Sequence, residues 1–215
     1  MAEQPSGFSP AKTQQPGMIY GMMMLHCFWI FSMIRITGGK LLRQTIESPP
    51  RSREVRPTTS MMRESIFNRL QAQVPGCRFL DLFAGSGIMG LEALSRGASF
   101  VLAVELHPEQ CRLIRKNYAK LKIPESQGKI IQFDVEKLLA KPCQEEPFDI
   151  IFMDPPYGLE KLSTLAIQCR THGWLKPGGV LIIEHGSREP ELPDFTRKIY
   201  GDSALSFFYN HPLEE

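Results

Sequence analysis

The sequence predicts an α/β fold built on a mostly parallel sheet with helices on both faces. Between residues 77 and 184, five apolar runs with strand character alternate with segments that repeat apolar residues at helical spacing. A glycine-rich turn follows the first of these runs. After residue 195 the alternation stops, and two strand-like runs separated by Gly201-Asp202 predict an antiparallel hairpin at one edge of the sheet.

Composition limits the chain to one sizeable domain with a small appendage, because it has 215 residues, of which 42% are hydrophobic and 22% charged. The net charge of only +2 gives no overall basic field that would indicate a nucleic-acid partner. The five cysteines form no CxxC pair, and no histidines lie at ligand spacing. We therefore expect reduced thiols in a cytoplasmic protein and no metal site.

The first 32 residues are set apart from the fold. Residues 1–16 are polar and aperiodic and are expected to be disordered. Residues 18–34 are apolar, but they are short for a membrane span and no small-residue cleavage site follows them. A signal anchor and a true translation start at Met33 both account for this stretch. The second is favoured because a folded domain begins at Met33, so no membrane association is expected.

A small amino-terminal module is expected at residues 33–75, before a main domain at residues 76–215. Strand-like runs on either side of Gly38-Gly39 predict a hairpin. A proline- and arginine-rich link leads to helix caps at residues 58–60. The helix that follows has an apolar face at helical spacing, formed by Met62, Ile66, Phe67 and Leu70.

The main domain then contains the alternating elements. Strands are expected at residues 77–83, 100–105, 129–133, 148–153 and 179–184, with the terminal hairpin at 195–200 and 203–210. Helices are expected near residues 86–96, 108–120 and 160–171, with a short one after residue 134.

The glycine turn predicts a site for a nucleoside cofactor. Gly85, Gly87 and Gly90 fit G-x-G-x-x-G between a strand and a helix, and Glu105 ends the next strand 20 residues after Gly85. Such glycines let the backbone approach a ligand closely, and an acid ending the second strand accepts hydrogen bonds from ribose hydroxyls. The glycine pattern alone does not distinguish a dinucleotide from S-adenosylmethionine.

Acids at other strand ends favour S-adenosylmethionine. Asp81 precedes the glycines, where a carboxylate would repel pyrophosphate but suits a cationic amino acid group. Asp134 ends the third strand, where it can accept a hydrogen bond from an adenine amino group. Each acid alone is also explained by a helix cap or a turn. Together they line the edge at which open α/β sheets bind ligands.

The tetrapeptide Asp154-Pro155-Pro156-Tyr157 follows the apolar run at residues 148–153. Prolines cannot donate to a sheet ladder or continue into a helix, so the strand must end there in a stiff corner. A surface turn is the simpler explanation. The corner instead predicts catalysis if it lies beside the glycine turn.

These motifs resemble those of a known family. The segments "DLFAGSG" and "DPPY", with "RPTTSMMRESIFNRL" upstream, resemble the RsmD-like bacterial methyltransferases, which methylate the exocyclic N2 of a guanine in small-subunit ribosomal RNA. The resemblance covers roughly residues 33–210 and implies a seven-stranded S-adenosylmethionine-dependent methyltransferase fold. The extension before Met33 and the pair Ile88-Met89 inside the glycine motif depart from the family pattern.

The resemblance also implies residue roles. Asp154 and the Pro155 carbonyl would accept hydrogen bonds from the two protons of the guanine amino group, Pro156 would add rigidity, and Tyr157 would stack on the base. The cofactor would contact Asp81, Phe83, Gly85, Ser86, Gly87, Glu105, Asp134 and Val135, and no metal is needed. RNA phosphates would contact Arg35, Lys40, Arg43, Arg51, Arg53, Arg56 and Arg63.

The implied partner is 16S ribosomal RNA or the assembling small subunit, bound by a monomer with no stable protein partner. Other functions remain open from the residues alone. An adenine-N6 methyltransferase also acts on an exocyclic amine, and protein glutamine methylation is disfavoured by the aspartate at position 154. A nicotinamide-binding oxidoreductase fits the glycine pattern, and a non-catalytic RNA-binding assembly factor would need no Asp154.

Overall fold

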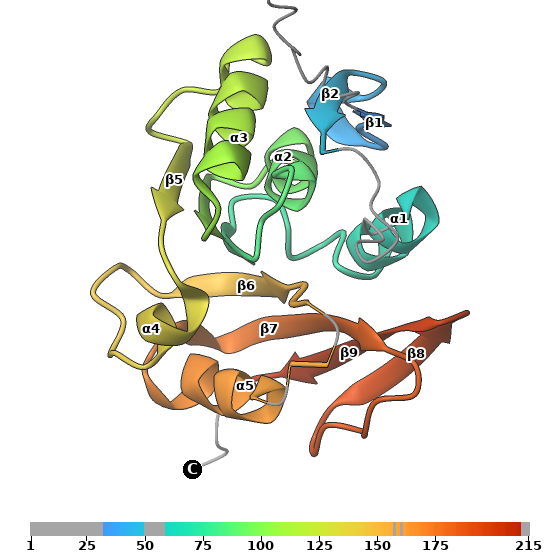
Figure 1. Ribbon diagram of the computed structural model, residues 1–215, viewed down its shortest axis with the longest axis vertical. Helices are drawn as coiled ribbons and strands as arrows, with labels where there is room; N and C mark the ends of the chain where they lie inside the picture. Colours follow the sequence, from blue (N-terminus) through green and yellow to red (C-terminus); the bar gives the residue numbers. More distant parts are fainter. Residues whose placement is uncertain (1–31, 50–58, 157, 160, 212–215) are drawn as a thin grey trace, which may run out of the picture.

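A computed structural model of the chain describes residues 32–49, 59–156, 158–159 and 161–211 (Figure 1). Its main feature is a seven-stranded sheet in the order β5-β4-β3-β6-β7-β9-β8. The first five strands of this order are parallel, and β9 and β8 pair antiparallel. The strands are β3 (Arg78–Leu82), β4 (Phe100–Glu105), β5 (Gly128–Gln132), β6 (Phe148–Met153), β7 (Leu175–Gly186), β8 (Thr196–Tyr200) and β9 (Ser203–Tyr209). The predicted fold class is confirmed.

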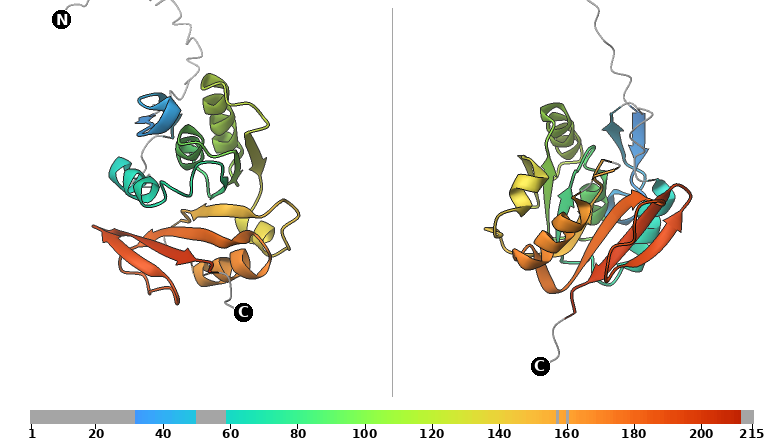
Figure 2. Two further views of the ribbon diagram at one scale, coloured as in Figure 1. Left: turned by 180° about the vertical axis from the view of Figure 1, so that it is seen from behind. Right: turned by 60° about the horizontal axis from the view of Figure 1, so that its bottom comes forward.

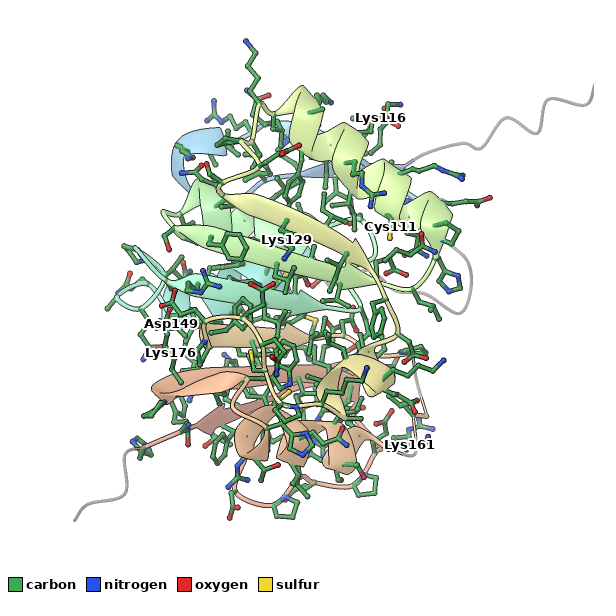
Figure 3. All side chains as sticks on the ribbon, turned by 90° about the vertical axis from the view of Figure 1, so that its left-hand side faces the viewer. Cys111, Lys116, Lys129, Asp149, Lys161 and Lys176 are labelled. Atoms are coloured by element: carbon green, nitrogen blue, oxygen red, sulfur yellow. The ribbon has the colours of Figure 1, made fainter. Side chains whose placement is uncertain are left out.

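The chain order changes direction at the centre of the sheet. From β3 the chain runs outward through β4 to β5, and it then returns through α4 (Val135–Leu139) to β6 on the other side of β3. Connections therefore leave β3 and β6 in opposite directions, and the carboxyl ends of these two strands form the switch point at which open α/β sheets bind ligands. Figure 3 shows Asp149 and Lys176, near the amino ends of β6 and β7, on the side opposite Cys111 and Lys161.

Helices cover both faces of the sheet (Figures 1 and 2). On one face, α2 (Ile88–Ser95) and α3 (Pro108–Lys120) bury a cluster that includes Phe79 of β3. On the other face, α4 and α5 (Leu162–Thr171) bury a second cluster that includes Leu80. Neighbouring residues of a strand point to opposite faces, so β3 contributes to both clusters.

The predicted amino-terminal hairpin and helix are confirmed. Strands β1 (Ser32–Arg35) and β2 (Thr45–Ser48) pair antiparallel and are joined through a 3-10 helix, η1 (Gly39–Leu41). Helix α1 (Ser60–Arg69) begins at Thr59, whose hydroxyl accepts the Met62 N–H at 3.2 Å. Ile46 of the hairpin and Phe67 of α1 join the same hydrophobic cluster as Phe79 of the sheet. The two elements therefore extend one face of the sheet (Figure 2).

Element boundaries differ from the prediction at three places. The hairpin turn includes η1, so it is longer than a turn at Gly38-Gly39 alone, and β2 starts only at Thr45. Gly39 has φ +74, and a side chain there would overlap the Ser95 carbonyl. Helix α2 starts at Ile88 because Gly87 is left-handed. Strand β7 starts at Leu175, earlier than expected.

Within the described ranges, no helix is both long and apolar enough to cross a membrane. Most of the apolar stretch at residues 18–34 lies outside those ranges. In the same described part of the chain, no group of three His, Cys, Asp or Glu side chains is arranged to hold a metal ion. Cys77, Cys111, Cys143 and Cys169 are free thiols.

Candidate active site at the carboxyl edge of the sheet

The glycine turn after β3 is held in an unusual backbone conformation. Phe83, Gly85 and Gly87 have φ values of 59°, 54° and 76°. Non-glycine residues rarely adopt such angles, and backbone strain of this kind tends to occur at functional sites. A Cβ on Gly87 would lie 2.9 Å from Ile114 Cγ2, so α3 packs directly against the turn. The predicted cofactor residues Phe83, Gly85, Ser86 and Gly87 are thus brought together in one rigid loop.

Glu105, at the end of β4, stabilises this turn by hydrogen bonds. Its Oε2 accepts the Gly85 N–H and its Oε1 accepts the His107 N–H, both at 2.9 Å. The side chain is buried, and an ionised carboxylate has lone pairs left for further hydrogen bonds. The sequence placed Glu105 beside the glycines correctly, and its contact with a ribose stays a prediction.

Asp81 lies elsewhere than the sequence suggested. Its side chain is 1% exposed and its Oδ2 accepts the Gly90 N–H at 3.0 Å. Because Phe79 and Asp81 share one face of β3, the carboxyl group points beneath α2, and the predicted contact with a cationic cofactor group is corrected. Asp81 instead fixes the start of α2 under the glycine turn.

The burial of Asp81 predicts a pH-dependent stability. Desolvation raises the pKa of Asp81 to about 8 from an ordinary value of 3.8. Between those values the folded chain keeps a proton that the unfolded chain releases, so this group's contribution to stability falls as pH rises. Asp81→Asn does not titrate and keeps an acceptor for Gly90. We expect the melting temperature of the variant, relative to wild type, to rise from pH 4.5 to pH 8.5. A difference that is constant with pH would contradict this pKa.

Asp134 is the amino-terminal cap of α4. Its Oδ1 accepts the N–H groups of Glu136 at 2.9 Å and Lys137 at 3.2 Å, and Val135 is buried as the first helical residue. The simpler explanation weighed for this acid, a helix cap, is therefore what the structure shows. Its second oxygen lies 4.0 Å from Lys137 Nζ. Recognition of adenine by Asp134 and Val135 stays a prediction.

Two apolar side chains at this edge were missed from the sequence. Leu106 and Phe133 are 53% and 40% exposed, and they directly follow the ends of β4 and β5. The Phe133 N–H donates to the Glu105 carbonyl at 3.0 Å, so the two loops lie side by side. Exposed apolar groups beside polar ones are typical of a site for a flat ring. The available signal was an apolar residue next to each strand-terminal acid.

The Asp154 corner lies beside the glycine turn. Met153, the last residue of β6, pairs with Leu82 of β3, and the Asp154 N–H donates to the Leu82 carbonyl at 3.4 Å. Asp154 is half-buried, Pro155 is buried and Pro156 is exposed. The structure thus brings the predicted corner and the predicted cofactor loop side by side at the switch point. Tyr157 lies outside the described residues.

Glu189 is a second missed residue near the corner. Its Oε1 accepts the N–H groups of Gly186 at 3.2 Å and Gly158 at 3.4 Å. It therefore joins the loop after β7 to the segment that follows the two prolines. No local pattern in the sequence marks this acid, because both of its partners are backbone groups brought together by the fold.

The predicted phosphate-binding residues divide into three groups. Arg35, Lys40 and Arg43 are exposed on the hairpin. Arg51, Arg53 and Arg56 lie outside the described residues. Arg63 is only 3% exposed, lies 3.6 Å from Glu92 and donates to the Arg35 carbonyl at 3.0 Å.

The prediction that Arg63 binds RNA is therefore wrong. Arg63 precedes Ile66 and Phe67 by three and four residues, so it lies on the buried face of α1 with them. Burial also lowers the pKa of its guanidinium group.

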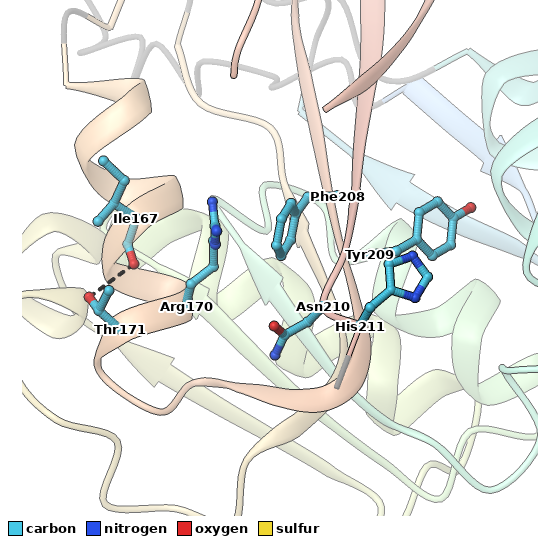
Figure 4. A pocket seen from close by; sticks show the side chains of 7 residues that line it. All are labelled: Ile167, Arg170, Thr171, Phe208, Tyr209, Asn210 and His211. Atoms are coloured by element: carbon cyan, nitrogen blue, oxygen red, sulfur yellow. Dashed lines mark hydrogen bonds between the residues drawn. The ribbon is translucent and has the colours of Figure 1, made fainter. Parts of the chain in front are cut away.

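A separate surface pocket of about 500 Å³ lies between α5 and β9 (Figure 4). It is lined by Ile167, Arg170, Thr171, Phe208, Tyr209, Asn210 and His211. Tyr209 pairs with Val180, which pairs with Ile150 early in β6, so this pocket lies at the amino-terminal edge of the parallel strands. The candidate site is at the opposite edge.

Comparisons with known proteins agree with this arrangement. A family profile described as "Conserved hypothetical protein 95" matches residues 34–209. The chain is 38% identical over 161 residues to the "Putative rRNA methyltransferase YlbH" of Bacillus subtilis, covering 71% of this chain and 86% of that protein. It is 33% identical over 151 residues to the "Ribosomal RNA small subunit methyltransferase D" of Escherichia coli, covering 70% and 74%.

A solved structure, the "Putative methyltransferase yhhF from Escherichia coli", superposes with a TM-score of 0.72 at 28% identity, covering 84% of this chain and 99% of that one. The family match spans most of the chain, including the glycine turn, the Asp154 corner and the hairpin. On these grounds the chain belongs to the RsmD family, whose profile is described as "Conserved hypothetical protein 95".

Proposed function

We propose that this chain is an S-adenosylmethionine-dependent methyltransferase that methylates the exocyclic N2 of a guanine in small-subunit ribosomal RNA. One observation carries the proposal. The glycine turn and the Asp154 corner lie side by side at the switch point of the sheet, where the Asp154 N–H donates to the carbonyl of the last residue of β3. The relatives named as ribosomal RNA methyltransferases support the substrate class.

The described residues fit the cofactor. The turn from Phe83 to Gly87, with three left-handed residues, presents backbone at the switch point, and the Glu105 carboxylate beside it accepts two backbone N–H groups. Leu106 and Phe133 supply exposed apolar surface for the adenine ring, with Asp134 and Val135 at its edge. When bound, the cofactor supplies an activated methyl group, so the chain needs only to bind, orient and exclude water.

The corner would orient the amine that receives the methyl group. A guanine amino group is a poor nucleophile because its lone pair is delocalised into the ring. The Asp154 carboxylate and the Pro155 carbonyl would each accept a hydrogen bond from the amino group, and the carboxylate would take the one proton that the nitrogen loses when it gains the methyl group. Acceptors on both protons favour a pyramidal nitrogen whose lone pair points at the methyl group. Pro155 and Pro156 keep these oxygens in place, and Tyr157 would stack on a base turned out of the RNA.

Nucleoside analysis of the product tests the reaction and the base together. The wild-type chain is incubated with isotope-labelled S-adenosylmethionine and small ribosomal subunits, or their naked 16S RNA, that lack the modification. N2-methylguanosine in the digested RNA is the expected product. N6-methyladenosine would instead establish the adenine-N6 alternative, and an unlabelled product would leave a non-catalytic RNA-binding role.

The protein would act as a cytoplasmic monomer on 16S RNA or on the assembling small subunit. Its hairpin would bind RNA phosphates. Replacing Arg35 and Arg43 together by glutamate should weaken RNA binding, because two exposed cations become anions. We expect the slope of log affinity against log salt to fall by about one for each phosphate that the variant no longer neutralises, with unchanged affinity for S-adenosylhomocysteine.

The control for this double variant is Lys141→Glu, which reverses one exposed charge two residues after the end of α4, a helix that packs on the other face of the sheet. RNA affinity is compared by filter binding over a range of salt concentrations. Equal losses per reversed charge in the control and in the hairpin variant would remove the hairpin from the RNA-binding surface.

A further inference from the structure

Asn117 of α3 connects the hairpin to the glycine turn. Its side-chain amide is 1% exposed. Oδ1 accepts the Glu47 N–H at 3.0 Å, and Nδ2 donates to the Glu47 carbonyl at 2.8 Å, so the side chain pairs with the edge of β2 as a neighbouring strand would. Nδ2 also donates to the Ser86 carbonyl at 3.3 Å. One buried amide therefore contacts both elements.

The surroundings of Asn117 are closely packed. Ile114 lies one turn earlier on the same helix, is fully buried, and packs against Gly87 of the turn. Tyr118, the next residue after Asn117, is buried against Gly90. Since this part of α3 is closely packed on the turn, a shift of the Ser86 carbonyl cannot be absorbed by empty space. It must move the Asn117 amide or break its hydrogen bonds.

The same helix also holds the hairpin by contacts that do not reach the turn. Lys120 Nζ donates to the Thr45 carbonyl at 2.6 Å. Lys116 Nζ lies 2.8 Å from the Glu47 carboxylate, on the exposed side of α3 (Figure 3). These lysines attach β2 to α3, whereas Asn117 attaches β2 to both α3 and the turn. The chain thus provides its own control for simple docking.

We propose that Asn117 is a positioning residue that makes cofactor binding and RNA binding cooperative. The inference rests on the proposed function, in which the glycine turn holds the cofactor and the hairpin contacts RNA. A cofactor that fixes the turn also fixes the Ser86 carbonyl, and through Asn117 it fixes the position of β2. By thermodynamic linkage, RNA that orders the hairpin must raise cofactor affinity by the same factor.

The test compares the affinity for S-adenosylhomocysteine with and without a fragment of small-subunit ribosomal RNA, by calorimetry. In the wild type we expect RNA to tighten binding by about fivefold or more, the usual lower range of such coupling. Asn117→Ala removes all three hydrogen bonds, and Asn117→Asp places a carboxylate oxygen against two carbonyls. In both variants the ratio should approach one. Lys120→Met, which removes only the hydrogen bond to Thr45, should keep the wild-type ratio.

A second measurement uses the wild type alone and does not depend on variants that fold poorly. The Glu47 amide hydrogen is bonded to Asn117, so S-adenosylhomocysteine should slow its exchange with solvent, while the Lys198 amide of β8 should be unaffected.

Methylation of RNA by the wild type is measured first, because its absence would sink the proposed function itself. If the wild type methylates RNA, three results overturn the role of Asn117 alone. The first is a wild-type ratio of affinities with and without RNA in both Asn117 variants. The second is a loss of that ratio in Lys120→Met as large as in the Asn117 variants. The third is a ratio of one in the wild type together with no slowing of hydrogen exchange at the Glu47 amide.

Discussion

Replacing Asp154 by alanine is expected to lower the turnover number for methyl transfer by about 10²–10³-fold, the usual effect of deleting one preorganised polar group that acts on the reacting atoms. The variant loses the carboxylate that would accept a hydrogen bond from the amino group of the target base. The Asp154 N–H, which donates to the Leu82 carbonyl, belongs to the backbone and remains. Affinity for S-adenosylhomocysteine should therefore stay within about twofold, as the glycine turn is unaltered.

Two further variants separate chemistry from folding. Asp154→Asn keeps one acceptor oxygen but adds an N–H₂ group that opposes the amine, so we expect an activity between wild type and alanine. Asp149 lies at the other end of β6, where it accepts the Arg78 N–H at 2.7 Å, so Asp149→Asn tests the strand without touching the corner. Single-turnover rates with RNA would measure each effect. If Asp154→Ala transfers methyl groups at the wild-type rate, the corner does not have the proposed role.

The meeting of the site residues could be predicted from the sequence because parallel strands end at a common edge. Gly85, Glu105 and Asp154 each follow or end an apolar run, and a βα alternation places all such positions together. Their local order was therefore enough to predict their meeting. The structure adds the register, in which Met153 pairs with Leu82 and brings the corner next to the turn.

The incorrect predictions involved residues whose surroundings come from distant parts of the chain. Arg63 was counted among the exposed cations, although its spacing from Ile66 and Phe67 already marked the buried face of α1. Asp81 lies on the same face of β3 as the buried Phe79, and it is covered by α2, a helix whose residues are all buried. In both cases the site was predicted from the charge of the side chain, although its spacing from apolar residues indicated a buried face. Glu189, by contrast, could not have been found, because its partners are backbone N–H groups from two loops.

The buried partner of Arg63 gives the largest expected effect on stability. Glu92 of α2 is 0% exposed, and its Oε1 accepts the Thr37 N–H at 2.7 Å and the Thr37 hydroxyl at 2.8 Å. Arg63 and Arg96 lie 3.6 Å and 3.4 Å from its carboxylate. This single carboxylate therefore ties the hairpin, α1 and α2 together.

We expect Glu92→Gln to destabilise the fold by about 3–5 kcal/mol, because the glutamine fills the same volume but removes the negative charge that lies beside the buried Arg63 guanidinium group. For a chain of this size that corresponds to a melting temperature lower by roughly 10 °C. Thermal unfolding followed by circular dichroism measures the shift. Glu145→Ala, which removes a surface pair with Lys129, should cost less than about 1 kcal/mol.

A second change in the same site identifies the cause of that loss. If the loss of the Arg63–Glu92 charge pair destabilises Glu92→Gln, then adding Arg63→Met should recover much of the stability, since a buried ion pair replaced by apolar groups of similar volume is often no less stable. If instead the missing bonds to Thr37 dominate, the double variant should melt no higher than Glu92→Gln. If Glu92→Gln melts at the same temperature as the wild type, neither the charge nor these bonds hold the hairpin against α2.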